Sequence, residues 1–207
     1  MTYFKMPSYH IRQLVRTGQS ASHRFWHDTS AGLSVEVVLI FPMLFWVYAG
    51  SFTFFNAYRA QGVNMKAAYS IADIVTRETT PIDMNYLIGM NTVYDFMVRN
   101  PYPTWIRVTS ISWSAEDDEF KVSWSHATKG QTTWTTNTLN NAHSDQLPIL
   151  ADGDFAVVVE AFTSYSPMFR RSIFAPLIGD VDFENFIVTS PRFVPRVCWE
   201  TSCFDSL

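Results

Sequence analysis

The stretch Val37–Phe55 holds no charged residue, and among its side chains only Ser51 and Thr53 are clearly polar. At 1.5 Å per residue, a helix of this length covers roughly 28 Å, about the thickness of a membrane's hydrocarbon core. The stretch therefore predicts a transmembrane helix. A fully buried helix of a soluble protein is the first alternative, and a cleaved secretory signal is the second.

The length of the stretch and its flanks argue against a secretory signal. A signal has an apolar core of roughly 7–15 residues, followed by a cleavage site of small residues. Here the apolar run is longer, and it ends in "FFNAYRAQ" without an A-x-A pattern. The preceding leader, Met1–Gly32, is also long for a signal. The sequence therefore predicts a helix that stays in the mature protein.

The basic residues around this helix bear on its orientation. The leader holds four of them against one acid, and two more follow the span: Lys5, Arg12, Arg16, Arg24 and Asp28, then Arg59 and Lys66. Close to the span the counts are nearly equal, but the short basic leader favours a cytoplasmic N-terminus.

Since the net charge is -4 and Lys and Arg are not clustered, no nucleic-acid partner is expected.

Helical periodicity continues beyond the apolar stretch. Apolar residues recur at helical spacing through "AYRAQGVNMKAAYSIADIVTRE": Tyr58, Met65, Ala68, Ala72 and Val75. We expect one helix over about 33–78, with one half in lipid and the other packed on a domain. A second helix is expected over about 82–98. Thr80 is its expected N-cap, Pro81 suits its first turn, and Asp83 is favoured by the helix dipole.

After Thr104 the pattern changes to the alternation typical of strands. "TWIRVTSISW" and "EFKVSWS" flank the turn "SAEDDE", which predicts a hairpin. "FAVVVEAFTSY" predicts a third, central strand. "FENFIVTSPRFVPRVCW" predicts a fourth strand at an edge, because Pro191 and Pro195 interrupt it. The polar segment 127–149 predicts a long loop with a short helix. These elements together predict an α+β fold: a long N-terminal helix, a second helix and a small antiparallel sheet.

No arrangement of reactive side chains in the sequence is typical of an enzyme. The five histidines lack a metal-ligand spacing and are expected on the polar surface: His10, His23, His27, His126 and His143. The four acids Glu116–Glu119 lack the glycine and ligand spacing of a calcium loop, which favours a solvated turn over a cation site. We therefore expect no catalytic residues, no metal and no cofactor. An enzyme with a membrane anchor is kept as a minor alternative.

The two cysteines, Cys198 and Cys203, lie close together near the C-terminus. In a reducing compartment they would stay as two thiols. In an oxidising compartment they would close a small loop that holds the terminus. We predict the disulfide if the domain is exported.

Glu36 is an acid near the start of the apolar stretch, where a carboxylate is either functional or close enough to water to be solvated. With Pro42, it belongs to the segment "GLSVEVVLIFPML". This segment resembles the N-terminus of the TadE/TadF-like minor pilins of the tight-adherence (Tad) pilus system. "SIADIVTRETTPID", "VVVEAFTSYSPMF" and "SPRFVPRVCW" resemble later segments of a TadE-like subgroup, in the same order.

The resemblance implies that a prepilin peptidase removes the leader. If the Glu is the fifth mature residue, the cut falls between Ala31 and Gly32, although the family prefers Gly where Ala31 stands. A cut after Gly32 restores that Gly and makes Glu36 the fourth residue. The Glu36 carboxylate would pair with the new N-terminal ammonium of a neighbouring subunit, and Pro42 would loosen or kink the helix.

The resemblance further implies a non-catalytic minor pilin or pseudopilin-like subunit. Its ranges would be a cytoplasmic leader (1–31), a transmembrane segment (32–57) and a periplasmic α+β domain (58–207). Its partners would be other pilin-like subunits, the Tad assembly machinery of the bacterial inner membrane, the prepilin peptidase and the lipid bilayer. Residence in the membrane and incorporation into an extracellular pilus both stay open. The alternative function is an uncleaved single-pass membrane protein with a periplasmic ligand-binding or sensory domain.

Overall fold

The computed structural model describes residues 32–99, 101–167 and 179–200. The chain forms two compact units, of which the first ends at Phe52 and the second begins at Thr53. The described part of the first unit is helical throughout, and the second unit, which we call the domain, holds all the strands.

The long helix α2 covers Gly32–Arg77, 46 residues, which confirms the helix predicted over 33–78. In the domain, its buried face repeats every three to four residues: Ala67, Ala68, Ile71, Ala72 and Val75. Tyr58 and Met65 were expected on this face, but they are 59% and 45% exposed. The spacing of apolar residues fits more than one face of a helix, and only the contact with the sheet selects one.

The second helix, α3, covers Met84–Val98, and its N-cap is Asp83. The Asp83 carboxylate accepts a hydrogen bond from the backbone N–H of Tyr86 at 2.8 Å. The prediction of Thr80 as N-cap was therefore wrong, and Pro81 precedes the helix instead of lying in its first turn. The reason is that Ile82 pairs with Trp199 as an isolated parallel bridge, so the backbone there is extended.

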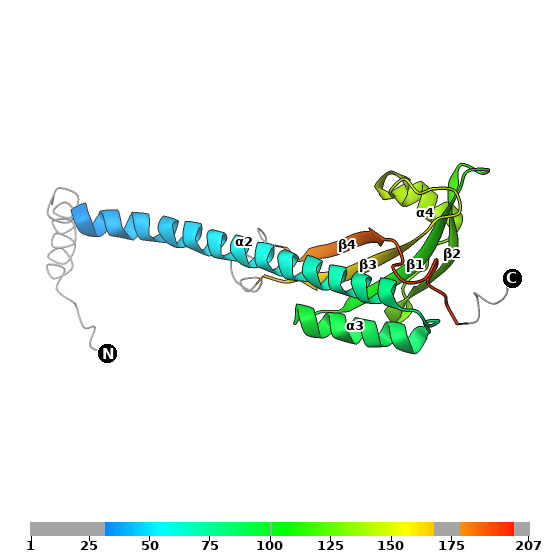
Figure 1. Cartoon of the computed structure of the whole chain (residues 1–207). Coiled ribbons are helices and arrows are strands. Elements are labelled where there is room, and N and C mark those ends of the chain that lie inside the picture. Colours follow the sequence, from blue (N-terminus) through cyan, green and yellow to red (C-terminus); the bar gives the residue numbers. More distant parts are fainter. Residues whose placement is uncertain (1–31, 100, 168–178, 201–207) are drawn as a thin grey trace, which may run out of the picture. The chain divides into compact units, whose positions relative to one another are not determined.

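The sheet is antiparallel with the strand order β2-β1-β3-β4 (Figure 1). Its strands are β1 (Thr104–Ser114), β2 (Glu119–Ala127), β3 (Phe155–Tyr165) and β4 (Val181–Thr189). The predicted β1–β2 hairpin, the central third strand and the fourth strand at an edge are confirmed. The short helix expected in the loop after β2 is α4 (Thr136–His143), flanked by the 3-10 turns η2 (Thr128–Gly130) and η3 (Ser144–Gln146).

The segment after β4 does not continue the strand as far as predicted. β4 ends at Thr189, before Pro191 and Pro195, and the chain then returns over the helices. The backbone N–H of Arg192 donates to the Thr76 carbonyl at the end of α2 (3.0 Å). Ile82 N–H donates to the Cys198 carbonyl, and Glu200 N–H donates to the Ile82 carbonyl, both at 2.9 Å. The C-terminal segment thus fastens the connection between α2 and α3.

Hydrophobic side chains fill both faces of the sheet. On one face α2 and α3 cover Ile106, Val108, Val157 and Val159, together with Trp199 of the C-terminal segment. On the other face, α4 and the segment after it cover a smaller cluster: Ile111, Phe120, Leu139, Leu147, Ala156 and Val158. These elements confirm the predicted α+β fold.

Candidate functional site

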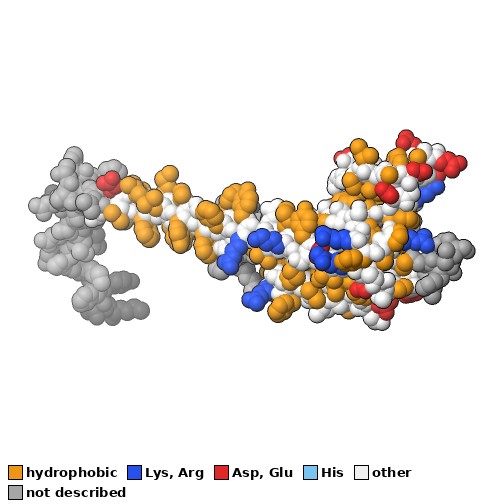
Figure 2. All heavy atoms as spheres, viewed as in Figure 1, with side chains coloured by type: hydrophobic (Ala, Val, Ile, Leu, Met, Phe, Trp, Pro, Cys, Tyr) orange, Lys and Arg blue, Asp and Glu red, His pale blue; other side chains and the backbone are white. Residues whose placement is uncertain are grey.

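The most distinctive surface of the molecule is the part of α2 before the domain. Its large hydrophobic side chains are exposed, for example Val38 (69% exposed), Leu39 (70%) and Met43 (70%). Figure 2 shows hydrophobic side chains along the visible face of this helical stretch. α2 is long and apolar enough to cross a membrane. An exposed apolar surface of this extent is unusual in a soluble monomer and is typical of a segment that contacts lipid or another protein.

The predicted site residues of this segment lie on α2 or immediately before it. Gly32 is the first residue of the helix, and Ala31 lies outside the described residues, so the cleavage site stays a prediction. Glu36 is exposed in the second turn. α2 runs through Pro42 without interruption, although a proline ring removes the hydrogen bond that residue 42 would donate to the carbonyl of Val38. Glu36 and Pro42 are about 9 Å apart along the axis and point in different directions.

The cysteines were predicted to form a disulfide. Cys198 lies half-buried in the C-terminal segment that pairs with Ile82. Cys203 lies outside the described residues, so the pairing of the two stays a prediction.

Two of the histidines expected on the polar surface are packed against aromatic rings instead. The His126 ring stacks on Trp199 with 3.7 Å between centroids, and its burial lowers its pKa, which Glu200 opposes. The His143 ring lies against Trp134 (5.1 Å) and Phe186 (4.7 Å). The first three histidines, His10, His23 and His27, lie outside the described residues.

The first three residues of the acidic stretch Glu116–Glu119 lie in the turn between β1 and β2, as predicted, and Glu119 is the first residue of β2. Asp117 pairs with Lys121 and accepts a hydrogen bond from the Ser114 hydroxyl, and these contacts lower the pKa of its carboxyl. Asp152 accepts a hydrogen bond from the backbone N–H of Ala115 at 2.8 Å. In the part of the chain that the structure describes, no three His, Cys, Asp or Glu side chains come together as metal ligands would.

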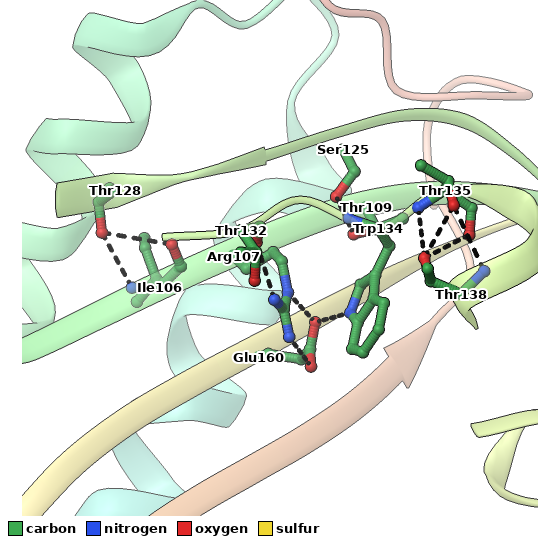
Figure 3. A network of polar contacts seen from close by, with 10 residues as sticks. All are labelled: Ile106, Arg107, Thr109, Ser125, Thr128, Thr132, Trp134, Thr135, Thr138 and Glu160. Carbon is green, nitrogen blue, oxygen red and sulfur yellow. Dashed lines mark hydrogen bonds and ion pairs between the residues drawn. The ribbon is translucent and has the colours of Figure 1, made fainter. Parts of the chain in front are cut away.

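An ion pair inside the domain was not predicted from the sequence. Arg107 of β1 and Glu160 of β3 lie opposite each other in the sheet, on the face that α4 covers. The Arg107 guanidinium donates from Nε and Nη2 to the two Glu160 carboxylate oxygens, both at 2.6 Å (Figure 3). The Arg107 side chain is 6% exposed and that of Glu160 is 0% exposed. Such a two-point pair satisfies both charges away from water.

This ion pair also holds the long loop to the sheet. Arg107 Nη1 donates to the Thr132 carbonyl at 2.8 Å, and the Trp134 indole N–H donates to Glu160 at 2.6 Å (Figure 3). The guanidinium carbon lies 4.3 Å from the centre of the Trp134 ring, as in a cation–π contact. The signal that was available was one Arg in "TWIRVTSI" and one Glu in "FAVVVEAF", each alone in an apolar strand.

The described surface of the domain includes two shallow hollows. One, of about 250 Å³, is lined mainly by apolar side chains of β1, β2 and the segment after α4, including Trp113, Phe120 and Leu147. The other, of about 290 Å³, lies between residues 78–80 and the C-terminal segment around Pro195. Both are slightly smaller than typical small-molecule sites, which occupy roughly 300–1,000 Å³.

The chain matches no protein-family model, no curated protein and no solved structure.

Proposed function

We propose that this chain is a non-catalytic minor pilin or pseudopilin-like subunit that acts in assembly of a Tad-type pilus. α2 holds it in the bacterial inner membrane, and the domain lies in the periplasm. The observation that carries the proposal is the form of α2: one helix whose first half exposes apolar side chains and whose second half packs on a sheet. The placement of Glu36 and Pro42 in the exposed half supports it.

The role of Glu36 follows from the cost of placing a carboxylate in an apolar surface. Cleavage of the leader creates an N-terminal ammonium at the start of α2. The Glu36 carboxylate of one helix offsets part of the desolvation cost of this ammonium on the next helix. Because the two groups lie about one helical turn apart along the axis, their pairing sets the offset between neighbouring helices. The partners are therefore other pilin-like subunits, in addition to the prepilin peptidase and the assembly machinery.

The mature N-terminus tests this proposal. We expect mass spectrometry of the membrane-extracted protein to find a chain that begins at Gly32 or at Leu33. A chain that still begins at Met1 contradicts the pilin proposal and leaves the uncleaved single-pass protein as the better description.

Substitution of Glu36 tests the pairing. The variant Glu36→Ala is expected to insert into the membrane and to fail in pilus assembly, because the ammonium of the neighbour loses its counter-charge. The matched control is Val38→Ala, two residues further along α2. It shortens a side chain that is 69% exposed, and this variant should assemble. Normal pili with Glu36→Ala would show that the carboxylate has no part in assembly.

A further inference from the structure

Three exposed cations lie at the end of the domain where its part of α2 begins. Arg59 and Lys66 belong to α2, and Arg99 follows the last residue of α3. We call these three residues the basic foot. Among the described residues, none of the three takes part in an ion pair. Figure 2 shows Lys and Arg side chains over this part of α2 and the adjacent end of α3.

The antiparallel packing of the two helices places Arg99 at a similar level along α2 to Arg59. The Tyr94 hydroxyl of α3 donates a hydrogen bond to Asn64 of α2, and both side chains are buried. Since α3 runs back along α2 from this contact, Arg99 lies near the level of Arg59. Arg99 also lies over the Phe96 ring at 5.7 Å, and this ring is 71% exposed.

The level of the foot along α2 coincides with the polar layer of a membrane. Arg59 follows Phe55, the end of the apolar stretch, by about 6 Å of helix rise. The headgroup layer on each side of a bilayer is roughly 5–8 Å thick. Arg59 and Arg99 therefore lie at headgroup depth. Lys66 lies about 10 Å further along the helix, within the range of screened electrostatic attraction.

Some other charges of the domain favour the same orientation. The acids of the β1–β2 turn, Glu116–Glu119, lie at the end of β1 opposite to Thr104, which follows α3. Near the foot, the Asp95 carboxylate is already engaged by Thr104 and lies 3.7 Å from Lys129. Asp182 and Glu184 of β4 alternate with Ile187 and so point to the face away from α2 and α3.

We propose that the basic foot binds the anionic headgroups of the membrane that α2 enters. The inference rests on the membrane anchor of the proposed function and adds a second contact between the domain and the bilayer. A single helix leaves the domain free to tilt and rotate, whereas cations on both α2 and α3 fix its orientation at the surface. Each Lys or Arg near an anionic surface strengthens such a contact by roughly fivefold.

The test uses the full chain reconstituted in nanodiscs that carry a nitroxide on their lipid headgroups. A bimane label is attached at Gln61→Cys, between Arg59 and Lys66, and in a second protein at Glu116→Cys, in the β1–β2 turn. The discs contain phosphatidylcholine alone or mixed with phosphatidylglycerol. The unsubstituted chain reports any labelling of Cys198 or Cys203. We expect the Gln61→Cys label to be quenched more strongly in anionic discs, and the Glu116→Cys label to be quenched in neither.

The variant Arg59→Gln/Lys66→Gln/Arg99→Gln separates the foot from the anchor. It should insert as before but lose the extra quenching in anionic discs, as should the unsubstituted foot at about 1 M salt, where screening extends only about 3 Å. Equal quenching in both lipids, or quenching that follows protein density instead of lipid charge, overturns the inference about the basic foot. Neither result contradicts the proposal that α2 anchors the protein in the membrane. A chain that does not insert at all overturns the proposed function as well.

Discussion

Ile40 and Ile71 lie on the same helix, but Ile40 is 44% exposed and Ile71 is 0% exposed. The same difference separates the large side chains of the first stretch from the buried face of the second. In the domain, α2 turns small residues such as Ala68 and Ala72 to the sheet. Before the domain, large hydrophobic side chains such as Val38 and Leu39 are exposed. One helix therefore lies in two environments, the protein interior in one half and, as we propose, lipid in the other.

The largest loss of stability is expected at the buried ion pair of the domain. The exposed part of α2 has no such buried charge. Glu160→Ala should lower the free energy of unfolding of the domain by about 3–5 kcal/mol, because Arg107 would stay buried without its counter-charge. Denaturant unfolding of the full chain in detergent, followed by tryptophan fluorescence, measures this. The double variant Arg107→Met/Glu160→Leu should recover part of the loss. A double variant as unstable as Glu160→Ala would contradict this account of the pair.

The next effect tests the comparison itself. Ile71→Ala should cost about 2–5 kcal/mol of unfolding free energy, since it leaves a cavity between α2 and the sheet. Ile40→Ala makes the same chemical change on the same helix and should leave the unfolding of the domain unchanged. The measurement is the same denaturant titration. If both variants were equally unstable, the two halves of α2 would not differ in the way their exposure indicates.

A smaller effect is expected at the start of α3. Asp83→Ala should cost about 1 kcal/mol, because the N-cap hydrogen bond to Tyr86 is lost. Thr80→Ala is the matched control, since Thr80 lies before the helix, is exposed and bonds to Glu78. Thermal unfolding of the two variants side by side distinguishes them. A larger loss of stability for Thr80→Ala than for Asp83→Ala would indicate that Thr80 is the N-cap, as predicted from the sequence.

The smallest effect is expected from pH. Burial lowers the pKa of His126 below 6.5, so the unfolded chain binds a proton more readily than the folded domain. The free energy of unfolding should therefore fall as the pH drops below 6.5 and rise as the pH returns to this value. In His126→Gln the slope between about pH 5.5 and 7.5, where ordinary carboxyl groups stay ionised, should be flatter. An unchanged slope in this variant would assign the dependence to another group.

The helices and strands could be predicted where the signal is local. The apolar run of α2, the alternation in β1 to β3 and the polar loop around α4 are each readable within a few turns or one strand. The N-cap of α3 could not be predicted in this way. The extended backbone at Ile82 depends on its pairing with Trp199, which is far away in the sequence. The length of β4 was overestimated because Val197 and Trp199 pack into the core cluster beside α2 and α3 instead of continuing the sheet.

The candidate site shows the same division. Glu36 and Pro42 were identified because a carboxylate and a proline are conspicuous in an apolar run. Arg107 and Glu160 were missed because they are 53 residues apart, and only the register of β1 and β3 places them side by side. The basic foot depends on the antiparallel packing of α2 and α3, which brings Arg99 to the level of Arg59. Sequence spacing along one helix does not contain that information.

The parallel bridge between Ile82 and Trp199 has a consequence for the order in which the protein is made. The connection from α2 to α3 is synthesised more than 100 residues before its hydrogen-bond partners, Cys198 and Glu200. The domain therefore cannot complete its folding until these residues have left the ribosome. A chain truncated before residue 197 would keep α2 and the four described strands but lack the closing segment. Such a chain is expected to be degraded by proteases.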